Sequence, residues 1–187
     1  RDPFSPCLGR TIEDIAAERG LSVPEAVIAL LLENELEIAY HDTEPSDEAV
    51  RAQLFEDQRV LFSDSRYTIG SDTIPNGEYR HPRGFGTYPR ILRLSREWGM
   101  PLEKTVHKLT AFPAELYGLK DRGTLEKGKR ADVCLFDPEK VTDQATFDSP
   151  LTPAQGIRTL IVGGKPVLRG GFLTGLLPGH ALKARQG

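Results

Sequence analysis

Apolar residues recur along this chain with two different periods. In the first two thirds they return every three to four positions, which is typical of amphipathic helices. This spacing predicts helices over residues 12–19, 23–33, 47–55, 88–98 and 101–109, and a short final turn over residues 110–116. Capping signals support the starts, since Ser22 and Glu25 have the spacing of a capping box and Ser46 can cap the helix that follows it.

Two of these helices show which residues should meet the core. The expected apolar faces are Ile91, Leu92 and Leu94 in the helix over 88–98, and Leu102, Val106 and Leu109 in the helix over 101–109. Arg90, Arg93 and Arg96 are expected to point mostly outward. Both helices therefore read as surface helices that cover a buried layer.

Strict alternation of apolar and polar residues predicts strands elsewhere. These strands are expected over residues 36–40, 67–72, 131–136, 157–162 and 166–169. The last three form one group, to which residues 172–175 are expected to add a fourth, short segment. Gly163 and Gly164 predict a two-residue hairpin, because both residues tolerate positive φ. The elements before residue 123 suit the closing part of an α/β barrel, and those after it suit a small antiparallel β unit with exposed edges.

The segment over 67–72 and the loop that follows it indicate an active-site edge. Asp72 stands where the chain leaves the expected strand, and the loop to Pro89 is rich in Gly, Pro, His and Arg. Catalytic groups of α/β barrels lie at the carboxyl ends of strands, so Asp72 is a candidate proton carrier. An Asp at such a place is also a common turn residue or helix cap, and the spacing leaves both roles open.

Composition narrows the class of protein. With 187 residues, 39% hydrophobic and 27% charged, the chain reads as an ordinary globular protein. A net charge of -3 and no basic run interleaved with aromatics argue against a nucleic-acid partner, and no apolar run is long enough to span a membrane. Cys7 and Cys134 form no disulfide framework, so a reducing cytoplasm is expected, with Cys134 as a small buried residue of a strand.

The beginning of the chain is unusual. It starts with Arg1, and its only methionine is Met100. We therefore expect a processed product or a piece of a longer protein.

Eight short motifs then occur in a characteristic order. They are Gly9-Arg10-Thr11-Ile12, Ile69-Gly70-Ser71-Asp72, His81-Pro82-Arg83, Gly86-Thr87-Tyr88-Pro89-Arg90, Thr110-Ala111-Phe112-Pro113-Ala114, Gly118-Leu119-Lys120-Asp121-Arg122-Gly123, Lys129-Arg130-Ala131-Asp132 and Gly163-Gly164-Lys165-Pro166-Val167. In this order they resemble the N-acyl-D-amino-acid deacylases, or D-aminoacylases, of the metal-dependent amidohydrolase superfamily. The resemblance covers nearly the whole chain.

The resemblance implies a fold and a reaction. These enzymes have a TIM barrel and a β-sandwich assembled from segments before and after it, so residues 1–122 would be the C-terminal part of the barrel and residues 123–187 part of the sandwich and a tail. The β unit would then take further strands from a missing N-terminal portion, or pair with another copy through its edges. By resemblance the enzyme uses zinc to cleave an N-acyl-D-amino acid, a small molecule, with Asp72 as general base and acid.

No metal ligand is assigned in this sequence. The four histidines, His41, His81, His107 and His180, form no His-x-His pair, and neither cysteine matches the family's metal-binding cysteine. His41 beside Asp42 could enter a site or be a polar loop residue. The chain by itself is therefore expected to be inactive.

His81 and Arg83 are the candidate substrate-binding residues. They belong to the loop after Asp72, where they could contact substrate or only stabilise the loop. Arg83 or Arg90 could pair with a substrate carboxylate. Thr73 departs from the family, which usually has Gly at this place, and this leaves the substrate's identity open.

Two other functions compete with the deacylase hypothesis. One is a non-catalytic domain that serves assembly or binding. The other is a different amidohydrolase, of the dihydroorotase or hydantoinase kind, which acts on cyclic amides.

Overall fold

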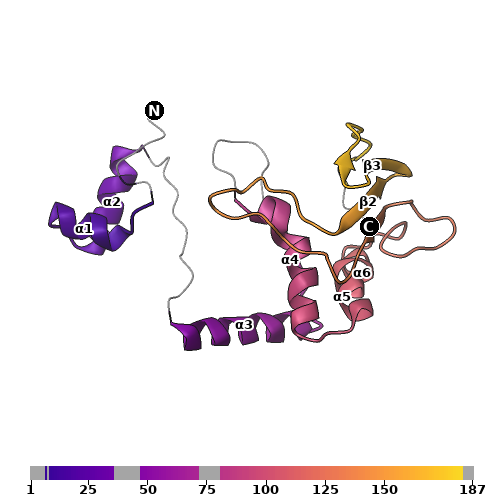
Figure 1. The fold of residues 1–187 in the computed structure, drawn as a ribbon, viewed down its shortest axis with the longest axis horizontal. Helices are drawn as coiled ribbons and strands as arrows, with labels where there is room; N and C mark the ends of the chain where they lie inside the picture. The colour runs from indigo at the N-terminus through magenta and orange to yellow at the C-terminus, as the bar shows by residue number, and fades with distance from the viewer. Residues whose placement is uncertain (1–6, 8, 36–46, 72–80, 183–187) are drawn as a thin grey trace. The chain divides into compact units, whose positions relative to one another are not determined.

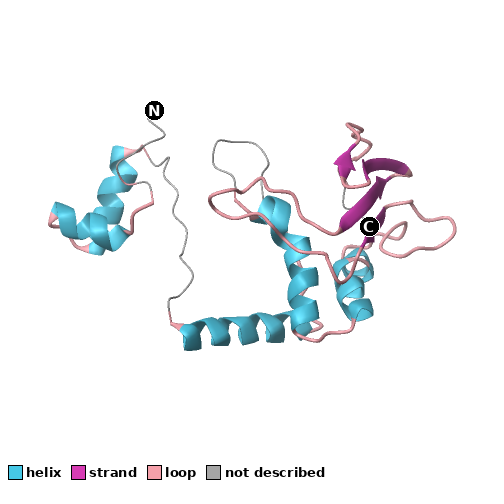
Figure 2. Cartoon of the chain, in the orientation of Figure 1, coloured by secondary structure: helices cyan, strands magenta, loops and turns pink. Residues whose placement is uncertain are grey.

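The structure, a computed structural model, describes residues 7, 9–35, 47–71 and 81–182 (Figure 1). The chain divides into two compact units, residues 1–44 and residues 45–187. Helices come first along the chain and a small antiparallel sheet follows (Figure 2), so the α/β class is confirmed at this level. The strand expected over 36–40, with His41 and Asp72, lies outside the described residues, and the boundary expected at residues 122–123 stays a prediction.

The first unit contains two capped helices, α1 (Ile12–Arg19) and α2 (Val23–Glu33). The Thr11 hydroxyl accepts the Asp14 N–H at 3.1 Å, and the Glu25 carboxylate accepts the backbone N–H of Ser22 at 2.9 Å. These contacts satisfy amides that the first turn of a helix leaves unpaired. Both predicted helices are confirmed to the residue.

The second unit begins with α3 (Glu48–Ser63), which is longer than predicted. Its cap is Asp47, whose carboxylate accepts the N–H groups of Ala49 at 2.8 Å and Val50 at 3.2 Å, so the assignment of the cap to Ser46 was wrong. The helix runs eight residues past Phe55 to Ser63, and Phe62 near its end is buried. That burial stabilises a last turn whose sequence has no clear periodic signal.

The next helices are α4 (Arg83–Glu97), α5 (Leu102–Leu109) and α6 (Ala111–Leu116). The start predicted for α4 at residue 88 was wrong, because the helix begins at Arg83, and Pro89 therefore lies inside it. Proline in a helix interior costs one backbone hydrogen bond, and here its ring is buried in return. The predicted face of α5 is also partly wrong, since Leu102 is 40% exposed while Thr105 is buried.

The sheet consists of β1 (Val133–Phe136), β2 (Ile157–Val162), β3 (Lys165–Arg169) and β4 (Phe172–Leu173), paired antiparallel in chain order. Gly163 and Gly164 join β2 to β3 with φ of 56° and 79°, as the predicted hairpin requires. Cys134 is exposed, against expectation. It pairs with Leu160, which is itself 36% exposed, because the described residues leave that face of the sheet largely open.

The strand predicted over residues 67–72 is not formed where the structure describes it. Residues 67–71 belong to no helix, turn or paired strand. A strand needs a neighbouring strand to complete its hydrogen bonds. Among the described residues the only sheet is the one made by β1–β4, and the Thr68 hydroxyl instead donates to the Lys108 carbonyl of α5 at 3.4 Å.

Candidate functional site

The described residues on the two sides of the 72–80 segment meet at the start of α4. The Ser71 hydroxyl donates to the Arg83 carbonyl at 3.5 Å, the long end of hydrogen-bond distances. Asp72 follows Ser71 directly in the sequence. The residue before the predicted proton carrier is therefore in contact with the first residue of α4.

His81 and Pro82 accept the backbone N–H groups that the start of α4 would otherwise leave unpaired. The His81 Nδ1 accepts the Arg83 N–H at 3.1 Å, and the His81 carbonyl accepts the Gly84 N–H at 3.0 Å. The Pro82 carbonyl accepts the N–H groups of Phe85 and Gly86 at 3.1 and 2.9 Å. In a neutral imidazole, an Nδ1 that accepts a hydrogen bond carries no proton, so this contact favours the tautomer with its proton on Nε2.

A ring from the β unit packs against His81. Phe147, in the connection between β1 and β2, lies edge-on to the imidazole with ring centroids 5.0 Å apart and planes at 79°. This is a favoured geometry for two aromatic rings. The structure thus brings His81 and Arg83 together with Ser71, and adds Phe147, which sequence reasoning missed because nothing local marks it.

The chain that leads to Ser71 is held by one buried lysine. Lys108 of α5 is 9% exposed, and its ammonium donates to the Asp64 carbonyl. The ammonium also lies over the rings of Phe62 and Phe112, at 5.5 and 5.8 Å from their centroids. Burial lowers the pKa of Lys108, while the nearby Asp64 charge opposes that shift.

Asp64, whose carbonyl accepts the hydrogen bond from Lys108, stands directly before a turn at residues 65–66. The Arg66 guanidinium donates to both carboxylate oxygens of Asp64, at 2.6 to 3.1 Å, and the Arg66 N–H donates to the carboxylate at 2.8 Å. These hydrogen bonds lower the pKa of Asp64 from 3.8 to about 2. The folded pKa lies below the ordinary one, so the stability from this contact is present above pH 3.8 and is lost as the pH falls through about 2.

Replacing Arg66 should remove most of this effect. In Arg66→Gln we expect the pKa of Asp64 to rise toward its ordinary value, because the guanidinium hydrogen bond is its first cause. A carbon-detected NMR titration of the carboxyl group measures it. Arg51→Gln, an exposed arginine on α3, is the matched control. An unchanged Asp64 titration in Arg66→Gln would contradict the assignment.

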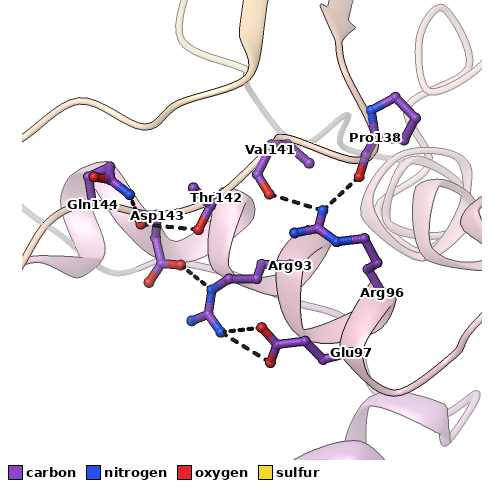
Figure 3. Close-up of polar contacts among 8 residues, drawn as sticks. All are labelled: Arg93, Arg96, Glu97, Pro138, Val141, Thr142, Asp143 and Gln144. Atoms are coloured by element: carbon purple, nitrogen blue, oxygen red, sulfur yellow. Dashed lines mark hydrogen bonds and ion pairs between the residues drawn. The ribbon is translucent and has the colours of Figure 1, made fainter.

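The second half of α4 is tied to the connection between β1 and β2 (Figure 3). Arg93 donates to Asp143 at 2.8 Å and to Glu97 at 3.0 Å, and Asp143 raises the pKa of Arg93. Arg96 donates to the carbonyls of Pro138 at 2.6 Å and Val141 at 3.2 Å. The prediction that Arg93 and Arg96 point outward was therefore wrong, because the β unit supplies acceptors where solvent was expected.

Within the described ranges, no three His, Cys, Asp or Glu side chains gather closely enough to hold a metal ion. His107 stacks on Phe112 with centroids 6.4 Å apart, and His180 is exposed. These residues do not fit a zinc site. In the same part of the chain, no helix has the length and apolar content needed to cross a membrane.

Comparison with known proteins shows which family this chain resembles. The model of the family described as "Amidohydrolase family" matches residues 26–168. A D-aminoacylase of Alcaligenes xylosoxydans xylosoxydans is 38% identical over 96% of this chain, which spans 35% of that relative. The crystal structure of a D-aminoacylase described as defining a novel subset of amidohydrolases has a TM-score of 0.72 and 36% identity, over 93% of this chain and 34% of its own.

The solved structure of a second deacylase is also similar to this chain. The N-acyl-D-glutamate deacylase of Bordetella bronchiseptica, complexed with zinc and a phosphonate mimic of the tetrahedral intermediate, has a TM-score of 0.67 and 34% identity, over 88% of this chain and 32% of its own. The chain thus spans about a third of the length of these relatives. The resemblance seen in the motifs is confirmed, and because the family model matches well over half of the residues, the chain belongs to the amidohydrolase family.

Proposed function

We propose that this chain is part of a zinc-dependent amidohydrolase that cleaves the N-acyl amide bond of N-acyl-D-amino acids, with Asp72 as general base and acid. The observation that carries the proposal is the 38% identity with a D-aminoacylase over 96% of the chain. A TIM barrel completed by a β-sandwich is the finer fold that goes with it. The described residues contain no ligand set for zinc, so the metal would be bound by residues outside them.

Asp72 would carry the proton of the reaction. Amide hydrolysis needs a group that takes a proton from the attacking water and returns it to the leaving nitrogen. A carboxylate serves both steps when its backbone is held in place. The support comes from its neighbours, since Ser71 contacts Arg83 and the preceding Thr68 is bound to Lys108.

Arg83 would bind the substrate carboxylate. Each N-acyl-D-amino acid carries a free carboxylate, and Arg83 is exposed at the start of α4. The N–H groups of residues 83–86 are already paired with His81 and Pro82, so they offer little to an anion. A guanidinium supplies two parallel donors that match a carboxylate.

A substrate panel tests the proposed function. The longest natural form of the protein, purified with zinc, is given N-acetyl-D-amino acids, their L enantiomers, dihydroorotate and hydantoin. We expect release of acetate from the D compounds, loss of it on chelation, and recovery when zinc is returned. Hydrolysis of only the cyclic amides would favour a dihydroorotase-like or hydantoinase-like enzyme. No hydrolysis of any compound would favour a non-catalytic domain.

The same assay tests Arg83. In Arg83→Gln we expect the KM for the free acid to rise about tenfold with kcat little changed, because one charge-assisted pair is lost. The C-terminal carboxamide of the substrate has no carboxylate, so its KM should be the same in Arg83→Gln and in the parent protein. Arg90→Gln is the matched control, one exposed arginine further along α4. If Arg90→Gln raises the KM and Arg83→Gln does not, the carboxylate role belongs to Arg90.

A further inference from the structure

Phe147 belongs to the β unit but touches the start of α4. It lies in the connection between β1 and β2, ten or more residues from either strand, and its ring is 46% exposed. The ring meets that of His81 edge to face, with the ring centroids 5.0 Å apart. A half-exposed phenylalanine contributes little to a core.

The segment that carries Phe147 is held against α4 at a second point. Four residues earlier, the Asp143 carboxylate accepts from Arg93 at 2.8 Å, and the Asp143 side chain is only 13% exposed. Between these two points the segment also comes close to buried Gly86, where an added Cβ would lie 4.0 Å from the Ala145 Cβ and 3.5 Å from the Asp143 Cβ. The connection between β1 and β2 therefore runs beside α4 toward its first residue (Figure 1).

His81 in turn determines the backbone at the start of α4. Its Nδ1 holds the Arg83 N–H at 3.1 Å, and the Arg83 carbonyl receives the Ser71 hydroxyl at 3.5 Å. Rotation of the imidazole would break the first of these contacts. A ring packed on one side of the imidazole opposes such a rotation, because it blocks the space the imidazole would sweep.

We propose that Phe147 is a positioning residue that orients His81 and, through the hydrogen bond between His81 and Arg83, the first turn of α4 for amide hydrolysis. This inference rests on the proposed function, since it is read first through activity. It assigns to the β unit a part in the reaction. Asp143 supports it by keeping the segment on α4.

A double-variant cycle tests whether Phe147 acts through His81. In the longest natural form, Phe147→Ala should lower kcat about tenfold, because misplaced groups cost turnover, and it should also raise the KM, because the displaced first turn carries Arg83. In a His81→Ala background the same change should cost less than about twofold, since the residue it orients is gone. Phe147→Tyr, which keeps the ring, should restore turnover. Phe172→Ala, an exposed phenylalanine of β4, is the matched control and should leave kcat unchanged.

Two outcomes would overturn the inference: equal losses of kcat in both backgrounds, or no loss in Phe147→Ala. A loss of melting temperature with kcat intact counts as the second. The nitrogen-15 spectrum of the imidazoles gives an answer that needs no activity, with the His81 signal identified by its absence in His81→Ala. We expect the Nε2–H tautomer in the parent protein and a mixture in Phe147→Ala. If the protein has no deacylase activity, the proposed function fails, and an unchanged tautomer in Phe147→Ala would still overturn the orienting role.

Discussion

The Asp72→Asn variant of the longest natural form is expected to lose about a thousandfold of kcat on an N-acetyl-D-amino acid, within the range that general acid–base groups contribute. An amide has the shape of the carboxylate but cannot take a proton from water at neutral pH or return it to nitrogen. Substrate binding uses other groups, so the KM should change little. Steady-state kinetics with the D substrate measure both constants.

A matched control separates loss of the proton carrier from the general effect of an Asp-to-Asn change. Asp57 is exposed on α3 and accepts a hydrogen bond from Gln53 at 2.8 Å, which an asparagine oxygen can also accept. Asp57→Asn should therefore keep full activity. If Asp72→Asn also keeps it, with its melting temperature unchanged, Asp72 is a turn residue or helix cap and the proposed mechanism is wrong.

The largest effect on stability is expected from Gly156→Ala. Gly156 has φ of 81°, and an added Cβ would lie 2.5 Å from the backbone nitrogen of Val141 and 2.6 Å from its Cα. Val141 is only 1% exposed, and the Gly156 carbonyl accepts the Asp137 N–H at 2.9 Å, so neither backbone can withdraw without breaking contacts. Left-handed strain and overpacking together should lower the free energy of unfolding by about 3 kcal/mol or more.

Gly171→Ala provides the control for strain alone. Its φ of 86° is nearly the same, but no heavy atom lies within 4 Å of the added Cβ. The expected loss is about 1 kcal/mol, from the backbone conformation only. Urea unfolding of the purified variants, followed by circular dichroism, compares the two losses. Equal losses would show that the contact between Gly156 and Val141 relaxes without cost.

Local signals explain why several elements were predictable. Thr11 and Gly20 bound α1, the Ser22 and Glu25 pair opens α2, and Gly163-Gly164 closes the hairpin. Each of these contacts joins residues only a few positions apart. The same kind of signal misled at α3, where the sequence pointed to Ser46 as the cap, but the Asp47 carboxylate is the group that accepts the first amides.

Contacts between distant segments explain the errors. Arg93 and Arg96 look like solvent-facing charges on an amphipathic helix, yet Arg93 also binds Asp143, and Arg96 binds the carbonyls of Val141 and Pro138, all more than forty residues away. The alternation over residues 67–71 is typical of a strand, but strand pairing requires a neighbour, and the described residues supply none there. The exposure of Cys134 has the same cause, since burial in a sheet depends on what covers its face.

The sequence by itself determined α1, α2, the hairpin and the resemblance to one hydrolase family, because caps, turns and ordered motifs act over short distances. It also singled out His81 and Arg83, although not how they are held. Only the tertiary structure decided that α4 begins at Arg83, that Phe147 packs on His81, and that Arg93 binds Asp143. Those contacts join α4 to the connection between β1 and β2, and residues so far apart in sequence meet only after the chain has folded.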